Sequence, residues 1–291
     1  MNTETDTRRG AESTDVDGAE ADGTDQEAEE RGVGPALAGD DLAVGYEPTD
    51  GPVVECEHVV LPAGEVTALV GPNGSGKSTL LKALAGQLTP WDGTVTLGDD
   101  DVYAMEKKPL ARRLGLLSQD GSLPDSLSVR ELARHGRHPH RGFLEPLTES
   151  DREAVEEALR LAGVGDLADS EVGNLSGGQR QLARVAMTLA QEPEVLLLDE
   201  PTTFLDLSHQ LQVLDAVREL NRERGVTVGI VLHDIAQAAR YADNLVALRD
   251  GTPYDWGPPD DVVTEELLAD VFEVDATVRD GPEIVPHRPL D

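Results

Sequence analysis

Residues Gly71–Ser78 read Gly-Pro-Asn-Gly-Ser-Gly-Lys-Ser, which fits the pattern G-x-x-x-x-G-K-[ST]. This stretch follows the apolar run Val66–Val70, which predicts a buried strand, and it leads into a predicted helix over Ser78–Leu84. Glycines let successive backbone N–H groups converge on phosphate oxygens, and the positive end of the following helix points at the same anion. The sequence therefore predicts a nucleotide-phosphate site between a strand and a helix.

The last residues of this loop have separate predicted roles. Lys77 would reach the β- and γ-phosphates, and the Ser78 hydroxyl would ligate Mg²⁺. The alternative is a glycine- and serine-rich turn without a ligand, which the strand–loop–helix context disfavours. We expect contacts with ATP from the following residues: Gly71, Asn73, Gly74, Ser75, Gly76, Lys77, Ser78 and Thr79.

A second apolar run, Val195–Leu198, ends in two carboxylates, Asp199 and Glu200. In open α/β folds, ligands bind at the carboxyl ends of the strands, so both side chains are expected at the phosphate site. We expect Asp199 to hold Mg²⁺ through water and Glu200 to orient or deprotonate the attacking water. Mere surface charge at a strand end is the alternative, and the phosphate loop disfavours it.

Apolar runs and helical segments alternate on both sides of these motifs, which predicts an α/β fold with a buried, mostly parallel sheet. Further strands are predicted over Leu42–Tyr46, Val53–Val60, Thr94–Leu97, Leu114–Ser118, Val226–Leu232 and Asn244–Leu248. Helices are predicted from Ser128 to His135, from a Ser150–Glu153 capping box, from Gly177, over Ser208–Arg222, over Ile235–Tyr241 and near Thr264–Val271.

The composition excludes several classes of protein. The 291 residues include 24 Lys+Arg and 57 Asp+Glu, so the formal net charge is −33 and binding to nucleic acid through a generic basic surface is disfavoured. The single cysteine, Cys56, excludes a disulfide scaffold and a cysteine-built zinc site. No apolar run approaches the roughly 18 residues of a membrane span, and the acidic amino terminus is unlike a secretory signal. We expect a soluble, intracellular chain.

The charge is unevenly distributed, and it predicts both a disordered acidic tail and a cytoplasm of high salt concentration. Residues 1–35 carry eleven acids and three arginines without an apolar period, so residues 1–37 are predicted to be a disordered acidic tail before a domain over 38–291. Molar salt screens such repulsion to a Debye length of about 3 Å. We therefore hypothesise a salt-loaded, halophilic cytoplasm, against the alternative of an ordinary protein with an acidic tail.

A second Ser/Gly loop stands twenty residues before the acidic strand and leads into a helix start, which makes it a second candidate anion site. It reads Leu175, Ser176, Gly177, Gly178 and Gln179. With this loop, the chain resembles the ATP-binding-cassette (ABC) ATPases throughout residues 41–291. The resemblance implies a P-loop NTPase fold with a mostly parallel core sheet, an antiparallel β subdomain, a helical subdomain at about 120–190 and a carboxyl-terminal extension at about 257–291.

The resemblance also implies roles for four further residues. Tyr46 matches the aromatic that stacks on adenine, Gln119 the Q-loop glutamine, Asp206 the D-loop aspartate and His233 the switch histidine. Gln119 would sense the γ-phosphate through Mg²⁺ or water, and His233 would contact that phosphate. Tyr46, Gln119 and His233 are weak signals individually, and a lone histidine is more often structural, but the six elements at compatible spacing are jointly strong.

The mechanism that the resemblance implies needs two cassettes. In this family a homodimer forms head to tail, and each ATP lies between one P-loop and the signature loop of the partner. Ser176 and the Gly177 and Gly178 amides would then act in trans on the γ-phosphate. The resemblance further implies a polytopic permease, an extracellular binding protein that acts indirectly, and a peripheral position on the cytoplasmic face of the membrane.

The segment Glu200–Gln210, with Thr-Thr-Phe-Leu-Asp followed by Ser-His-Gln, looks like that of importers for iron–siderophore, haem and cobalamin chelates. The stretches Val129–Leu132 and Gly136–His140 also resemble these importers, although a tyrosine is common where His138 stands and an arginine is common where Leu182 stands. We expect an importer ATPase for an iron–siderophore type chelate, with a cobalamin or haem importer as the first alternative. A soluble, non-transport ABC ATPase, an exporter half and a regulatory module with little turnover are further alternatives.

The basic cluster Arg134–Arg141 is unusual in so acidic a chain. A metal site would use His135, His138 and His140, but no regular ligand spacing supports one. Docking of a cytoplasmic helix of the permease is the favoured hypothesis, and a plain solvated face is the alternative.

Overall fold

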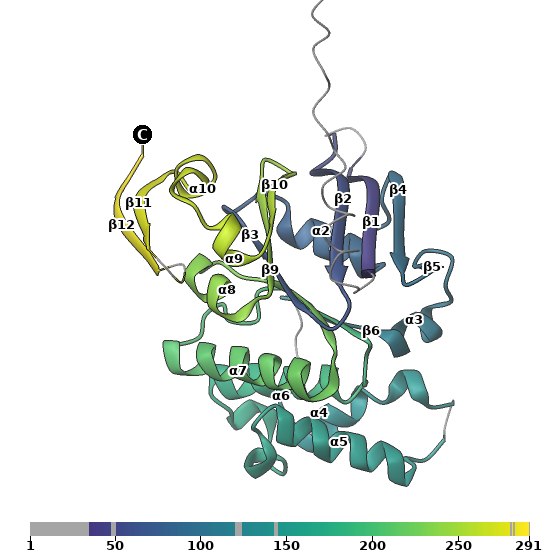
Figure 1. Ribbon diagram of the computed structural model, residues 1–291. Helices are drawn as coiled ribbons and strands as arrows, with labels where there is room; N and C mark the ends of the chain where they lie inside the picture. The colour runs from purple at the N-terminus through teal and green to yellow at the C-terminus, as the bar shows by residue number, and fades with distance from the viewer. Residues whose placement is uncertain are drawn as a thin grey trace, which may run out of the picture. The chain divides into compact units, whose positions relative to one another are not determined.

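Six strands form the central sheet, in the order β10-β9-β3-β8-β7-β6 (Figure 1). The inner pairs are parallel, and only β10 runs antiparallel, beside β9. The strands β3, β7 and β8 are buried along their whole length, because helices cover one face of the sheet, and a helix together with the second sheet covers the other, which leaves no polar alternation. Their bounds are β3 Val66–Val70, β6 Leu114–Leu117, β7 Val195–Leu198, β8 Thr227–Val231, β9 Asn244–Arg249 and β10 Thr252–Gly257.

This computed structural model describes residues 35–47, 51–119, 124–142, 145–279, 281 and 283–290. The predicted tail therefore lies outside the described residues, apart from its last three. These belong to strand β1, which begins at Pro35 rather than after residue 37, because Leu37 is fully buried. Within the described part of the chain, no helix is both long and apolar enough to cross a bilayer.

A second, antiparallel sheet has the order β2-β1-β4-β5. Its strands are β1 Pro35–Val44, β2 Val54–Pro62, β4 Asp92–Leu97 and β5 Asp100–Asp101. Cys56 lies on β2 with its side chain buried, and its Sγ is 3.3 Å from the carbonyl oxygen of His58. Burial raises the pKa of the Cys56 thiol to about 12, because the charged thiolate is poorly solvated there.

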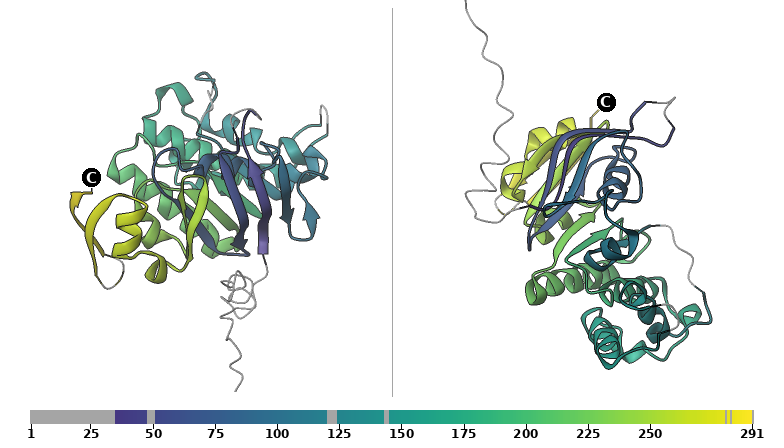
Figure 2. Two further views of the ribbon diagram at one scale, coloured as in Figure 1. Left: turned by 90° about the horizontal axis from the view of Figure 1, so that it is seen from above. Right: turned by 90° about the vertical axis from the view of Figure 1, so that its right-hand side faces the viewer.

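The helices α4, α5 and α6 pack on one another at the end of this part of the chain away from β1 and β2 (Figure 2, right). They span Val129–His135, Glu149–Leu161 and Gly177–Leu189, and α7, Leu207–Arg224, packs against α6. The other helices are α2 Lys77–Leu84, α3 Lys107–Arg113, α8 Ile235–Tyr241, α9 Pro259–Val262 and α10 Glu265–Asp270, followed by the hairpin β11 Val274–Arg279 and β12 Glu283–Pro289.

The predicted capping box of α5 is wrong. The helix begins at Glu149, so Ser150 lies inside its first turn, and the N-cap is Thr148. The Asp151 amide lies 3.2 Å from Thr148 Oγ1, and the Asp151 carboxylate accepts the Thr148 N–H at 2.9 Å. Asp151 rather than Glu153 completes the box because an ion pair with Arg137 also holds the Asp151 side chain.

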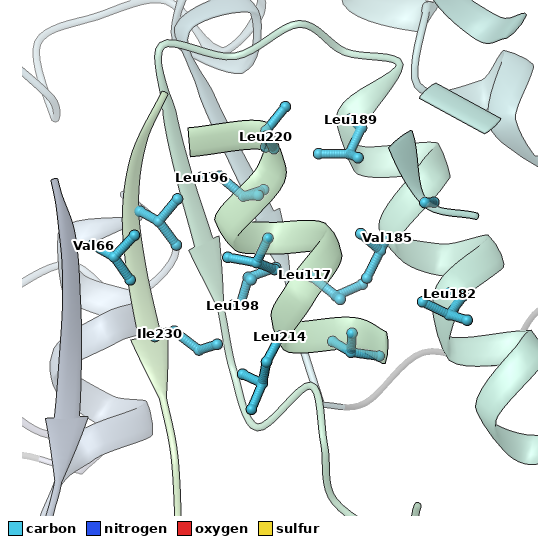
Figure 3. Packing of buried hydrophobic residues seen from close by; sticks show 14 of the residues in the cluster. Val66, Leu117, Leu182, Val185, Leu189, Leu196, Leu198, Leu214, Leu220 and Ile230 are labelled. Atoms are coloured by element: carbon cyan, nitrogen blue, oxygen red, sulfur yellow. The ribbon is translucent and has the colours of Figure 1, made fainter. Parts of the chain in front are cut away.

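The core beneath the sheet joins strands to helices (Figure 3). Leu196 and Leu198 of β7 are fully buried and face α7, where Leu214 and Leu220 contribute to the same cluster. Leu182, where an arginine was expected from the family, is buried in this core. Hydrophobic packing thus fixes the carboxyl ends of the strands relative to the start of α7.

Candidate functional site

The phosphate loop joins β3 to α2, and two glycines shape it. Gly71 has a φ of 145°, and a Cβ there would overlap the carbonyl oxygen of Leu248. Gly76 is the N-cap of α2 with a φ of 95°, and a Cβ there would lie 2.6 Å from Val54 Cγ2. No side chain caps α2, so the N–H groups of its first turn remain available to a ligand.

Lys77 is the buried cation of this loop. Its Nζ donates hydrogen bonds to the carbonyl oxygens of Gly71, at 2.9 Å, and Pro72, at 2.7 Å. Burial lowers the pKa of Lys77, and the carboxylates of Glu200 and Asp199 oppose that shift. Because the Lys77 ammonium group is poorly solvated, an anion bound at the loop would stabilise its charge.

Ser78 and Asp199 bring two predicted metal ligands together. Ser78 Oγ donates a hydrogen bond of 2.6 Å to Asp199 Oδ1, and Asp199 is buried at the end of β7. The Oγ of Ser75, also buried, has no hydrogen-bond partner among the described residues. A hydroxyl and a carboxylate are the hard oxygen ligands that Mg²⁺ prefers, and the orphaned Ser75 hydroxyl fits a phosphate oxygen.

Glu200 is the meeting point of the predicted catalytic residues. Its Oε2 accepts a hydrogen bond from Gln119 Nε2 at 2.8 Å and pairs with His233 Nε2 at 2.7 Å. The Thr203 hydroxyl also donates to this oxygen, at 3.0 Å. Glu200 has a φ of 51°, a strained conformation for a residue other than glycine. Segments after β6, β7 and β8 thus converge on one carboxylate.

Thr203 was not predicted as a site residue. It lies three residues after Glu200, where a turn returns its hydroxyl to the carboxylate, and this spacing was the only available signal. Trp91 was also missed, although its ring lies against Gly45, next to Tyr46. Aromatic residues make up only 3% of the chain, so the position of this tryptophan was a signal available in the sequence.

Tyr46 lies at the edge of the phosphate loop. Its side chain is 56% exposed, and its hydroxyl is 3.3 Å from Thr79 Oγ1 on α2. An exposed aromatic ring fixed beside the loop is available for stacking on a base.

The second Ser/Gly loop starts α6 and is capped by its own side chains. Ser176 is the N-cap, its Oγ accepts the Gln179 N–H at 3.2 Å, and Gln179 Oε1 accepts the Ser176 N–H at 3.1 Å. The pocket at the phosphate loop is lined by Val53, Asn73, Gly74, Gly76, Lys77, Ser78, Thr79 and Glu200. Leu175–Gln179 contributes nothing to this wall as described, so one chain does not bring the two loops together around that pocket.

Asp206 caps α7. Its carboxylate accepts the His209 N–H at 3.0 Å, and His209 Nδ1 lies 2.8 Å from both of its oxygens. These contacts lower the pKa of Asp206, because they stabilise the ionised carboxylate. Phe204, two residues earlier, is 97% exposed and has a φ of 63°.

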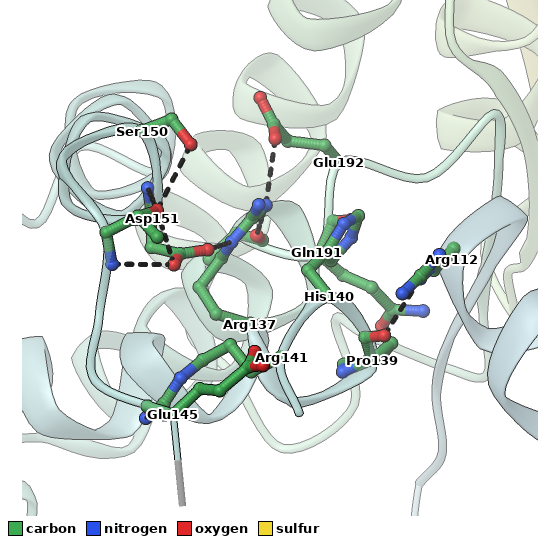
Figure 4. A network of polar contacts seen from close by, with 12 residues as sticks. Arg112, Arg137, Pro139, His140, Arg141, Glu145, Ser150, Asp151, Gln191 and Glu192 are labelled. Atoms are coloured by element: carbon green, nitrogen blue, oxygen red, sulfur yellow. Dashed lines mark hydrogen bonds and ion pairs between the residues drawn. The ribbon is translucent and has the colours of Figure 1, made fainter. Parts of the chain in front are cut away.

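The basic cluster Arg134–Arg141 divides into a buried and an exposed part. Arg137 is buried and bonds Asp151 at 2.9 Å, the Ala190 carbonyl oxygen at 2.8 Å and Glu192 at 2.8 Å (Figure 4). Both predicted alternatives are wrong for Arg137, because its buried side chain can neither contact a permease helix nor be solvated.

The exposed part borders a groove. The His135 and His138 rings stack with centroids 5.3 Å apart. Burial and the neighbouring His138 lower the pKa of His135, with Glu131 opposing the shift. The groove is lined by Leu127, Glu131, Arg134, His135, His138, Arg141 and Leu147.

Comparisons with known proteins agree over most of the chain. A protein-family model described as ABC transporter matches residues 58–203. The ferric enterobactin transport ATP-binding protein FepC of Escherichia coli is 45% identical over 246 residues, which are 84% of this chain and 90% of FepC. The cobalamin import ATP-binding protein BtuD of Halobacterium salinarum is 39% identical over 230 residues, which are 79% of this chain and 57% of BtuD.

Two solved structures show a similar fold. An inward-facing metal-chelate type ABC transporter has a TM-score of 0.73 and 28% identity, covering 89% of this chain and 98% of that one. A dimeric bacterial ABC transporter cassette has a TM-score of 0.67 and 25% identity, covering 77% and 98%.

Proposed function

This chain belongs to the family of ABC transporter ATPases, and we propose that it energises the import of an iron–siderophore type metal chelate. The family match confirms the predicted resemblance, the P-loop NTPase fold and the ATPase activity. The similarity to FepC and to the siderophore transport system ATP-binding protein YusV of Bacillus subtilis supports the chelate class. The similarity to BtuD supports cobalamin as the second candidate.

The single observation that carries the proposed catalysis is the convergence of Gln119 and His233 on the Glu200 carboxylate. Glu200 would accept a proton from the attacking water, and the two neighbours would orient the carboxylate and the γ-phosphate. Lys77 would hold the β- and γ-phosphates, and Tyr46 would stack on the base. Ser78, Asp199 and Gln119 would hold Mg²⁺, which would supply positive charge to the phosphate oxygens.

ATPases of ABC importers work as dimers with membrane permease components. We propose that this chain forms a homodimer in which Ser176 and the amides of Gly177 and Gly178 complete the partner's nucleotide site. Two observations support this arrangement. The α6 start carries two glycines, of which Gly177 is exposed, and the phosphate pocket of one chain has no wall from the signature loop. The permease would place the dimer at the cytoplasmic face of the membrane.

Replacing Glu200 with glutamine tests the assignment of the base. Glu200→Gln should keep ATP binding and lower hydrolysis by roughly two orders of magnitude or more, because the amide cannot accept the proton. Phosphate release and binding of a fluorescent ATP analogue measure the two effects. Glu153→Gln, an exposed glutamate of α5, is the matched control. A Glu200→Gln variant that hydrolyses at the wild-type rate would remove Glu200 from this role.

The chelate can be identified in proteoliposomes that contain the cognate permease and binding protein. We expect a ferric siderophore to stimulate hydrolysis more than cobalamin or haem does. Stimulation by cobalamin alone would favour the second candidate. The absence of a permease gene beside this one, together with failure to associate with membranes, would favour a soluble ABC ATPase.

We propose that the groove of Arg134, His135, His138 and Arg141 receives a cytoplasmic helix of the permease. Its basic rim within an acidic chain supports an acidic or carbonyl-rich partner surface. Arg134→Ala with His138→Ala should weaken coupling to the permease while leaving basal hydrolysis intact. Arg152 is an exposed arginine of α5 outside the groove, and Arg152→Ala is the control. Unchanged coupling would mean that this face is merely solvated.

The acidic charge supports a proposal about habitat. With a net charge of −33, self-repulsion should destabilise the folded chain at low salt. We propose a halophilic cytoplasm and expect the Tm to rise between low and molar KCl. A Tm that does not rise with KCl would reject the proposal.

A further inference from the structure

The first turn of α7 contacts three segments that carry proposed site residues. It contains Ser208, His209 and Gln210, which the sequence singled out only as marks of a subfamily. On one side, the imidazole of His209 hydrogen-bonds the Asp206 carboxylate through Nδ1, at 2.8 Å from each oxygen. The backbone N–H of His209 donates to the same carboxylate at 3.0 Å. One residue therefore fixes the D-loop aspartate through two groups.

The other side of the His209 ring lies against the start of α6, the helix that begins at the second Ser/Gly loop. A Cβ built on Gly178 would overlap the Cβ, Cγ and Cδ2 atoms of His209. Gly178 therefore cannot carry a side chain while the ring is in place, and the ring limits how far the start of α6 can move toward α7. The His209 side chain is only 27% exposed, although Asp206 is largely exposed.

Gln210 extends the contact toward the switch histidine. Its Nε2 donates to the Leu205 carbonyl oxygen at 3.0 Å, and its Oε1 accepts from Gln237 Nε2 at 2.8 Å. Gln237 is in the first turn of α8, whose N-cap, Asp234, directly follows His233. The start of α7 thus contacts the D-loop, the start of α6 and the first turn of α8.

From these contacts we infer that His209 is a positioning residue that holds Gly178 and Asp206 in a fixed relation. The inference rests on the proposed dimer, because both residues belong to the segments that would complete the nucleotide site of the partner. Phe204, exposed and in a left-handed conformation, shows that the outer edge of the D-loop has little packing of its own. Its support comes from the helix start behind it.

Three variants separate the two contacts of the His209 ring, and all three keep the backbone N–H bond to Asp206. His209→Ala removes both ring contacts, His209→Asn keeps a donor near the Nδ1 position, and His209→Phe keeps a ring against Gly178. We expect His209→Ala to lower kcat about tenfold with the KM for ATP changed less than twofold, because the phosphate loop is untouched. Each of the other two variants should recover part of kcat. Equal kcat in all variants, or a loss of kcat that follows only a lower Tm, would overturn the inference.

Mixed dimers test whether His209 acts on the partner's nucleotide. Limiting wild-type chain in excess Glu200→Gln chain gives the reference rate, since the Glu200→Gln chain should hydrolyse roughly a hundredfold or more slowly. Limiting His209→Ala in excess Glu200→Gln should reach that rate, because its nucleotide meets an intact signature surface. Limiting wild type in excess chain that carries both substitutions should fall about tenfold.

The reverse pattern would mean that His209 serves its own nucleotide and would overturn the inference. Failure of the proposed function is distinguishable from this outcome, because wild-type chain would then show no ATP hydrolysis at all. Wild-type hydrolysis with three equal mixtures, in chains that still dimerise with ATP, would reject only the role of His209.

Discussion

Two helix starts in this chain can receive phosphate, and they are built differently. Helix α2 begins after Gly76 without a side-chain cap, and its Lys77 is buried and bonded to the loop. Helix α6 begins after Ser176 with a complete capping box, and its first turn is bordered by the His209 ring. The start of α2 leaves its N–H groups to a ligand, whereas α6 satisfies part of its own and presents glycine amides between fixed neighbours.

This difference suggests a division of labour. An uncapped start with a desolvated lysine gains most from tight binding of an anion, so α2 is suited to hold nucleotide within one chain. A capped and sterically bounded start is already rigid, so α6 is suited to a contact that forms only on closure of a dimer. Substitutions at α2 should therefore affect binding, and substitutions at α6 should affect turnover.

The substitution with the largest expected effect removes Arg137, which bonds Asp151 and the C-cap of α6. Arg137→Ala should lower the free energy of unfolding by about 3–5 kcal/mol, because it leaves Asp151 buried without its partner and the Ala190 carbonyl oxygen at the C-cap of α6 without a donor. Urea unfolding measures this loss. Arg152→Ala breaks only an exposed pair with Glu149 and should cost less than about 1 kcal/mol. Similar losses in the two variants would show that the buried pair does not stabilise this region.

The next effect removes the cation of the first helix start. Lys77→Ala should weaken ATP binding about a hundredfold, because no other described lysine or arginine lines the phosphate pocket. Titration with a fluorescent ATP analogue gives the Kd. Lys82→Ala, in the last turn of the same helix, should bind ATP as the wild type does. Equal losses at both lysines would indicate a general charge effect rather than a phosphate contact.

A smaller effect is predicted from the pH dependence of Asp151. Burial opposes its ionisation, but hydrogen bonds from Thr148 and Arg137 outweigh burial and lower the pKa of this carboxyl to about 2. A lowered pKa stabilises the fold above the unfolded-state value of about 4, and this contribution is lost as pH falls from about 4 to 2. The stability difference between wild type and Asp151→Asn should be constant above pH 5 and narrow by about 2 kcal/mol by pH 2. A difference independent of pH would contradict the assignment.

The smallest effect removes the cap of the second helix start. Ser176→Ala should cost about 1 kcal/mol of stability and lower kcat about tenfold, with ATP binding by the isolated chain unchanged. Calorimetry and steady-state kinetics provide the two measurements. Thr264→Ala removes the cap of α10, far from the site in sequence, and should lower stability without lowering kcat. Weaker ATP binding in Ser176→Ala would erase the distinction between the two helix starts.

Much of the fold was predictable because its strands are short and continuously apolar. The predictions of β7 as Val195–Leu198 and α8 as Ile235–Tyr241 are confirmed residue by residue. Helix α3, Lys107–Arg113, escaped prediction because it has no buried residue and so no apolar period. The cap of α5 was misplaced because Ser150–Glu153 and Thr148–Asp151 both fit the local pattern, and only the distant Arg137 distinguishes them.

The site was predictable where a motif carries its own chemistry. The phosphate loop and the acidic strand end name their residues directly, and the structure places Ser78 against Asp199. The contacts of Thr203 and His209 depend on how a turn and a helix start pack against other segments. No spacing in the sequence encodes that Gly178 lies under an imidazole ring. Such positioning residues become visible only in three dimensions.

The burial of Cys56 has a practical consequence for all the dimer experiments. The chain has one sulfhydryl, and with a pKa near 12 it holds almost no nucleophilic thiolate at neutral pH. A cysteine introduced on the surface, for example at Phe204, would therefore be the only site that maleimide dyes or spin labels modify. Distances between two subunits as they close can therefore be measured with labels without first replacing Cys56.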